Sequence, residues 1–281
     1  MNSGIVLINK PQGWTSFDVV NKIKHIVRPQ KVGHLGTLDP MATGVLLVTI
    51  GKATKLFDLM QEKVKTYQAE FEFGYETDSL DSTGKIEKRS GKTIFSDSEI
   101  KNALKPLVGE VDQVPPKFSA KSLNGVRAYE MARKNIDFDI PAKKVKIFKI
   151  DLLKNEKNKI NLEIECGSGT YIRAIGRDLA NRLDSCATMT KLTRTKVGNV
   201  LLEDCQNVQD LTVENIKILP IEHFLDFKTL DVSDQECMRL LNGQTLNLEL
   251  ENGNYFLKQF DKVVAIVKID DFLAKMFIFL G

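Results

Sequence analysis

The chain has 281 residues, of which 42% are hydrophobic and 27% are charged, a composition that excludes an intrinsically disordered protein. Forty Lys and Arg residues against 37 Asp and Glu residues leave a net charge of +3, which by itself is too small to indicate a nucleic-acid partner. The four cysteines form no CxxC pair, and no apolar run approaches the ~20 residues that span a bilayer. These features favour a soluble, cytoplasmic protein with reduced thiols.

Strands and helices are predicted from hydrophobic periodicity and from helix-capping residues. In chain order they are an apolar strand at 4–10, a helix from the cap Ser16 to about Ile26, a strand buried on both faces at 44–51, a half-buried strand at 66–74, a helix beginning near Ser96 or Ser98, strands at 145–153 and 159–167, and a helix beginning near Tyr171. Because strands and helices do not alternate regularly, the order predicts an α+β fold with a mixed, largely antiparallel sheet.

Two regions stand apart from this pattern. Residues 113–149 open on Pro115-Pro116, contain one short helix near 127–133, and read as a long inserted arm; long ordered loops are usually functional. Residues 229–281 predict a short helix and then short strands with Asn-Gly turns, which we interpret as a small, separate β-rich domain. The rest, residues 1–228, then forms the main domain.

Positive charge gathers in the arm. Residues 117–149 hold nine basic and three acidic residues, a local net charge of +6, whereas residues 228–281 carry a net charge of −2. A local excess of this size suits a polyanion, because each neutralised phosphate releases condensed counterions. On charge alone, a solvated face with extra lysines is the simpler explanation.

The segment at residues 31–55 carries the most chemical information. Asp39 lies between Leu38 and Pro40, directly before the buried strand, so its direction can be fixed by the scaffold. An Asp beside Pro and small residues usually makes a turn or caps a helix, and the residues alone leave that alternative open. No phosphate-loop spacing is present, and the three histidines form no cluster typical of a metal site.

Six segments of the chain resemble motifs of the TruB family of tRNA pseudouridine synthases. "GHLGTLDPMATGVL" resembles the family's catalytic motif, and "INKPQGWTSFDVV" resembles its KPxGxTS opening. "KTYQAEFEFGYETDSLDSTG" is similar to its K-x-Y strand and the loop that follows, and "QVPPKFSAKSLNGVRAYEMAR" to its thumb segment. "GTYIRAIGRDLANRL" and "KLTRTKVG" follow in the family's order. The resemblance implies the pseudouridine synthase fold, with residues 113–149 as a thumb arm and residues 229–281 as a small PUA-like RNA-binding domain.

The resemblance also implies roles for single residues. The resemblance makes Asp39, Arg173 and Tyr67 the catalytic residues: Asp39 falls on the family's catalytic aspartate, Arg173 on the arginine that pairs with it and keeps it ionised, and Tyr67 on the active-site tyrosine that stacks on the target base. His34, Tyr171 and Leu192 fall on substrate-binding positions. Bottom-up, each has a plainer interpretation: a core aromatic for Tyr67, a surface arginine beside Asp178 for Arg173, and a turn residue for His34.

One departure from the family pattern concerns a basic motif. Thr193 stands where an arginine is common, which leaves Arg194 and Lys196 as the basic residues for phosphate contacts. The acidic loop with Asp78 and Asp81 also allows an alternative, a metal site for phosphoryl chemistry, although the resemblance makes it a structured loop.

The implied activity is isomerisation of uridine 55 in the TΨC loop of tRNA, with base flipping and an aspartate nucleophile. Neither a metal nor an organic cofactor is implied, and the expected partner is the tRNA T-stem-loop, bound by a monomeric, cytoplasmic enzyme without an obligatory protein partner. A tRNA-binding chaperone without catalysis would share the basic arm, and a phosphohydrolase would use Asp78 and Asp81.

Overall fold

The computed structural model describes residues 3–61, 63–119, 121–123, 125–134, 136–260 and 262–280. Within these residues the four cysteines are free thiols. None of the described helices has both the length and the apolar character that crossing a bilayer requires.

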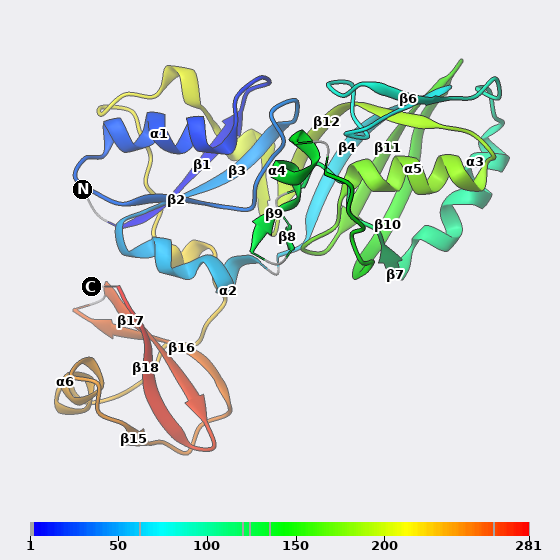
Figure 1. Ribbon diagram of the computed structural model, residues 1–281. Helices are drawn as coiled ribbons and strands as arrows, with labels where there is room; N and C mark the ends of the chain where they lie inside the picture. The colour runs from blue at the N-terminus through cyan, green and yellow to red at the C-terminus, as the bar shows by residue number, and fades with distance from the viewer. Residues whose placement is uncertain are drawn as a thin grey trace.

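One large sheet organises the main domain (Figure 1). Its described strands run in the order β14-β1-β3-β12-β4-β11-β10-β7, with β2 added beside β3 and β13 beside β12. Most neighbours are antiparallel; β1 with β14 and β3 with β12 are parallel, so the expectation of a mixed, largely antiparallel α+β sheet is confirmed. The strands are β1 (Gly4–Lys10), β2 (Val32–Leu35), β3 (Thr43–Ile50), β4 (Lys65–Phe73), β7 (Gly109–Gln113), β10 (Lys143–Glu156), β11 (Lys159–Cys166), β12 (Ala187–Val197), β13 (Val200–Leu201) and β14 (Gln206–Asn207).

Helices pack on both halves of this sheet. They are α1 (Ser16–Ile26), α2 (Phe57–Gln61) after the 3-10 turn η1 (Gly51–Leu56), α3 (Asp97–Leu104) and α5 (Ile172–Arg182). Ser96 caps α3, as one of the two predicted caps. The predicted cap of α1 is wrong by one residue: Thr15 caps the helix, because Asp18 stands three positions later and completes a capping box with it.

Burial follows the predicted periodicity. Every second side chain of β4 from Tyr67 to Phe73 is buried in the main core, and β3 is buried almost throughout. The backbone of β3 meets β12 only at Thr43 and Gly44, so the sheet opens into two halves on either side of this contact. The arm lies between β7 and β10, and Figure 1 draws its helix α4 (Ala128–Arg133) and its hairpin β8 (Ser122–Leu123) and β9 (Val126–Arg127) between α1 and α5.

A second, four-stranded sheet lies at the C-terminal end, in the order β15-β18-β17-β16. Helix α6 covers one of its faces. The elements are α6 (Asp234–Leu241), β15 (Leu246–Asn247), β16 (Gly253–Gln259), β17 (Lys262–Asp270) and β18 (Leu273–Phe279); a further small hairpin, β5 (Tyr75–Thr77) with β6 (Ile86–Arg89), belongs to the main domain. The boundary at residues 228 and 229 stays a prediction.

The turns of this second sheet differ from the expectation. Asn242-Gly243 follows the end of α6, with Gly243 at a φ of 81°, and Asn252-Gly253 leads into β16; neither forms a hairpin turn. The turn between β17 and β18 is instead Asp271-Phe272, with φ values of 47° and 64°. Tight hairpins need two residues in the left-handed region, and here non-glycine residues adopt it.

The two sheets share apolar contacts. Phe256, Ile266 and Ile278 of the second sheet belong to the same buried cluster as Leu56 and Met60 of η1 and α2. Across this junction the Lys52 ammonium lies 4.3 Å from the centre of the Phe279 ring. The C-terminal sheet is therefore joined to the main domain by core packing.

We expect Gly176→Ala to destabilise the protein, although Gly to Ala inside a helix normally raises stability by about 1 kcal/mol. A Cβ on Gly176 of α5 would lie 2.4 Å from two ring carbons of Phe71, which is fully buried and has no room to move. The expected loss is about 1–3 kcal/mol in urea unfolding. On a Phe71→Val background the same change should cost less; an equal cost on both backgrounds would refute the steric explanation.

Candidate active site

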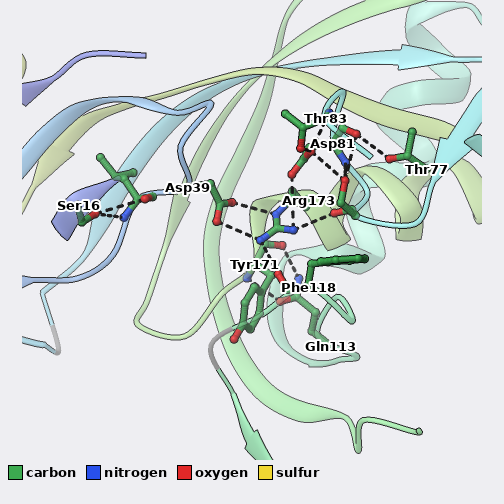
Figure 2. A network of polar contacts seen from close by, with 11 residues as sticks. Ser16, Asp39, Thr77, Asp81, Thr83, Gln113, Phe118, Tyr171 and Arg173 are labelled. Carbon is green, nitrogen blue, oxygen red and sulfur yellow. Dashed lines mark hydrogen bonds and ion pairs between the residues drawn. The ribbon is translucent and has the colours of Figure 1, made fainter. Parts of the chain in front are cut away.

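Asp39 lies on a loop that is held on both sides. Before it, Leu38 N–H donates to Ser16 Oγ at 2.9 Å, and Ser16 Oγ donates back to the Leu38 carbonyl at 3.3 Å (Figure 2). After it, the Pro40 carbonyl accepts from Gly13 N–H at 2.8 Å and from Lys10 Nζ at 3.3 Å. The KPxGxTS segment therefore fixes the backbone on both sides of the carboxylate.

Lys10 is fully buried beneath this loop. Its ammonium also donates to the carbonyls of Pro11 and Trp14, at 2.9 and 2.6 Å. Burial lowers the pKa of Lys10 to about 8, and the negative charge of Asp39 opposes this shift. Lys10 thus links the loop of residues 11–14 to the loop that contains Asp39 and Pro40.

Arg173 binds Asp39 with two donors. Its Nε lies 2.9 Å from Asp39 Oδ2 and its Nη2 donates to Oδ1 at 3.1 Å, a side-on pair that fixes both the direction and the plane of the carboxylate (Figure 2). The Arg173 side chain is 7% exposed, whereas that of Asp39 is 33% exposed. The carboxylate is thus anchored on one side and open to a ligand on the other.

Asp81 is a partner that the sequence interpretation missed. Arg173 Nη1 lies 3.6 Å from Asp81 Oδ2 and donates to the Ser79 carbonyl at 2.8 Å. Asp81 also accepts from Ser79 Oγ and from Thr83 N–H, at 2.9 and 3.0 Å. The signal was the TD-x-x-D-x-x-G loop, but nothing in its spacing shows that it faces a helix 90 residues later.

Tyr67 and Leu192 lie on neighbouring strands in the same buried cluster. Tyr67 is paired across β4 and β12 with Arg194, and Leu192 is paired with Ala69. Burial raises the pKa of the Tyr67 phenol, while the charge of Arg194 and its hydrogen bond to the phenol act in the opposite direction. A neutral aromatic ring and an apolar side chain thus line this part of the sheet.

Tyr171 and His34 lie on different elements of the fold. Tyr171 is the N-cap residue of α5, two positions before Arg173, and lies near it in Figure 2. His34 lies on β2, where burial lowers the pKa of its imidazole and the charge of Arg194 lowers it further. Its buried Nδ1 has no hydrogen-bond partner among the described atoms. The structure brings Asp39 and Arg173 into contact, whereas His34 lies within the electrostatic influence of Arg194.

Arg194 is not available for phosphate contacts, contrary to the expectation from the sequence. It is 1% exposed, and its Nε donates to the Val45 carbonyl at 2.7 Å and its Nη2 to the Gly36 carbonyl at 3.1 Å. The side chain therefore ties β12 to β3 and to the loop that leads to Asp39. An arginine between Thr193 and Thr195 suggests a surface position, but the parallel β3–β12 pairing covers it.

The geometry amounts to one oriented carboxylate beside a buried tyrosine. Within the described part of the chain, no group of three or more His, Cys, Asp or Glu side chains is placed to hold a metal ion. Asp81 faces Arg173, and Asp78 accepts from the Lys85 N–H at 2.9 Å, so these two carboxylates have different partners. Such a carboxylate can act as a nucleophile or a general base toward a ligand that enters from the open side.

Comparison with known proteins finds similar sequences over most of the chain. Residues 24–172 match the family described as TruB family pseudouridylate synthase (N terminal domain). The tRNA pseudouridine synthase B of Clostridium tetani is 39% identical over 244 residues, which cover 86% of this chain and 84% of that protein. That of Mycoplasma mobile is 36% identical over 267 residues, 94% of this chain and 90% of the relative.

A solved structure shares the fold. An H/ACA ribonucleoprotein bound to a substrate RNA containing 2′-deoxyuridine includes a chain with a TM-score of 0.72 and 21% identity, covering 99% of this chain and 85% of that one. The fold and the extent of the sequence matches lead to one conclusion: the chain belongs to the TruB family of pseudouridylate synthases.

Proposed function

We propose that this pseudouridine synthase acts on tRNA and converts uridine 55 of the TΨC loop to pseudouridine. The observation that carries the proposal is the two-donor contact between Arg173 and Asp39 on a loop fixed on both sides. The relatives in Clostridium tetani and Mycoplasma mobile are named tRNA pseudouridine synthase B, which supports tRNA as the substrate. Uridine 55 follows from the resemblance of the motifs to the family.

In the reaction Asp39 serves as the nucleophile. The N1–C1′ glycosidic bond breaks, the uracil turns, a C5–C1′ bond forms, and the proton on C5 is lost while N1 gains one, so the product is an isomer of the substrate. Addition of the carboxylate to uracil C6, attack at ribose C1′ and removal of a ribose proton to give a glycal all require the same aimed carboxylate. Arg173 fixes the direction of that carboxylate through its two contacts with Asp39.

Tyr67 and Leu192 would enclose the flipped uracil. Both side chains are buried, at 7% and 6% exposure. They offer an aromatic ring and an apolar group, the surfaces that usually hold an extruded base. Tyr171 and His34 would contact the RNA around it. Unstacking the target base costs a few kcal/mol, which stacking and basic contacts offset.

The basic arm and the C-terminal sheet would hold the rest of the T-stem-loop. The arm carries the +6 charge of residues 117–149, and the C-terminal sheet is proposed to dock RNA as a PUA-like domain.

We further propose that the enzyme works as a monomer in the cytoplasm, without a cofactor or an obligatory protein partner. Incubation with an unmodified tRNA transcript, followed by mapping of pseudouridine, tests the activity; a chaperone would bind the transcript and leave it unmodified.

Asp39→Asn should lower the rate of pseudouridine formation by roughly 10³- to 10⁴-fold, because an amide is not a nucleophile of comparable strength. The binding of tRNA should change little, since the amide retains an oxygen toward Arg173. Single-turnover rates and binding titrations measure the two effects. Asp58→Asn, on the exposed side of α2, is the matched control and should keep the normal rate. Full turnover by Asp39→Asn would rule out the nucleophile assignment.

Arg173→Lys should keep a positive charge beside Asp39 and still lose about 100-fold in rate, because lysine lacks the planar fork that fixes the carboxylate. It should also destabilise the protein, since the buried Asp81 loses a partner. Single-turnover kinetics and thermal unfolding separate the two effects. If lysine supports the normal rate, charge alone is sufficient and the aiming role is wrong.

Lys143→Ala should reduce the slope of log affinity against log salt concentration for tRNA by about one, the value expected for one lost phosphate contact. Lys143 and Lys144 are consecutive in β10 and face opposite sides; Lys144 lies 3.4 Å from Asp112. Lys144→Ala should therefore change the slope less. Equal slopes for the wild type and Lys143→Ala would show that Lys143 does not contact the RNA backbone.

A further inference from the structure

The base of the arm is bound to the start of α5, the helix that carries Arg173. Gln113, the last residue of β7, is 2% exposed. Its Nε2 donates to the Tyr171 carbonyl at 3.1 Å, and Tyr171 N–H donates to its Oε1 at 2.8 Å (Figure 2). One side-chain amide therefore pairs with both backbone groups of a residue 58 positions away, as a neighbouring strand would.

Tyr171 depends on this contact more than an ordinary N-cap residue does. It makes no side-chain capping bond to α5, although the first N–H groups of a helix need partners outside the helix. Gln113 instead holds the peptide groups of Tyr171 from outside. Because Arg173 is the second residue of α5, the position of its Cα follows the position of this peptide.

The same stretch of the arm also reaches the guanidinium group. The Phe118 carbonyl accepts from Arg173 Nη2 at 3.1 Å, and the Val114 carbonyl accepts from Arg177 Nη2 at 2.9 Å. Between these contacts Pro115 and Pro116 are buried and restrict the backbone. Residues 113–118 thus lie along the first turns of α5 with three separate attachments.

The guanidinium group of Arg173 has partners on three parts of the chain. Nε and Nη2 face Asp39, Nη1 donates to the Ser79 carbonyl and lies 3.6 Å from Asp81 Oδ2, and Nη2 also donates to the Phe118 carbonyl. Together these partners fix the orientation of the guanidinium plane. The base of the arm supplies one of these partners, the Phe118 carbonyl. Through Gln113 it also holds the backbone from which the Arg173 side chain extends.

We propose that Gln113 is a positioning residue for the isomerisation, which aims Arg173 at Asp39 by holding the backbone at the start of α5. The inference rests on the proposed function, because it assigns Gln113 to the step in which Asp39 reacts. Gln113 itself touches neither Asp39 nor the base. Residues 113–118, the base of the arm, then also contribute to the active site.

Gln113→Met is the test, because methionine fills a similar volume and removes both hydrogen bonds to Tyr171. With excess enzyme and unmodified tRNA transcript, we expect the single-turnover rate constant to fall by roughly 10- to 100-fold, the effect of a small misplacement of catalytic groups. The dissociation constant for tRNA should stay within about twofold of the wild-type value. A purely structural role would not separate rate from affinity in this way.

The chain offers a matched control. Gln206 makes the same kind of amide clamp far from Arg173: its Nε2 donates to the Asn215 carbonyl and its Oε1 accepts from Lys217 N–H, both at 2.9 Å. Gln206→Met should keep the wild-type rate and affinity. A rate loss in Gln206→Met as large as in Gln113→Met would overturn the proposal, because general loosening of the fold would then explain both.

Gln113→Glu decides the question if the methionine variant does not fold. Glutamate keeps an acceptor for Tyr171 N–H and loses the donor to the Tyr171 carbonyl, so we expect a single-turnover rate constant below that of the wild type with little change in the dissociation constant for tRNA. A wild-type rate in either folded variant, or a loss of affinity equal to the loss of rate, would refute the positioning role. If the wild-type enzyme itself forms no pseudouridine, the proposed function fails instead.

Discussion

The ion pair of Asp39 and Arg173 sets the requirements that the surrounding structure meets. A buried charge is tolerated only when its hydrogen-bonding groups are satisfied, and Arg173 is 7% exposed with five donors to place. Acceptors therefore have to come from separate parts of the chain: the loop before β3, the loop with Asp81, and the base of the arm. The fold brings these segments to one guanidinium group.

The seam between β3 and β12 places the two halves of the site. The backbones meet at Gly44 and Arg194, where a Cβ on Gly44 would lie 2.2 Å from the Arg194 carbonyl oxygen. Arg194 then extends under the Asp39 loop and reaches Val45 and Gly36. A glycine and a buried arginine at one crossing thus connect the loop that leads to Asp39 with β12, the neighbour of the strand that carries Tyr67.

Local pattern and motif resemblance predicted much of this protein. The alternating burial of the side chains of β4, the burial of β3 and the Ser96 cap depend on residues close by in the sequence. Each of them could therefore be predicted from the sequence. The helix cap at Thr15 was also encoded locally, by Asp18, but an adjacent serine concealed it. The burial of Arg194 and the contacts of Asp81 and Gln113 join segments far apart in the chain, and no spacing within either segment specifies them.

The apolar cluster shared by the two sheets also bears on how the chain folds. Phe256, Ile266 and Ile278 share one buried cluster with Leu56 and Met60. Each of the two sets is therefore fully shielded from water only when the other is in place. Strands β16 to β18 are synthesised long after η1 and α2, so Leu56 and Met60 lack part of their apolar surroundings until the C-terminal sheet packs against them. Folding of the C-terminal sheet is thus coupled to the stability of a region about 200 residues earlier in the sequence, and the two sheets should unfold as one cooperative unit.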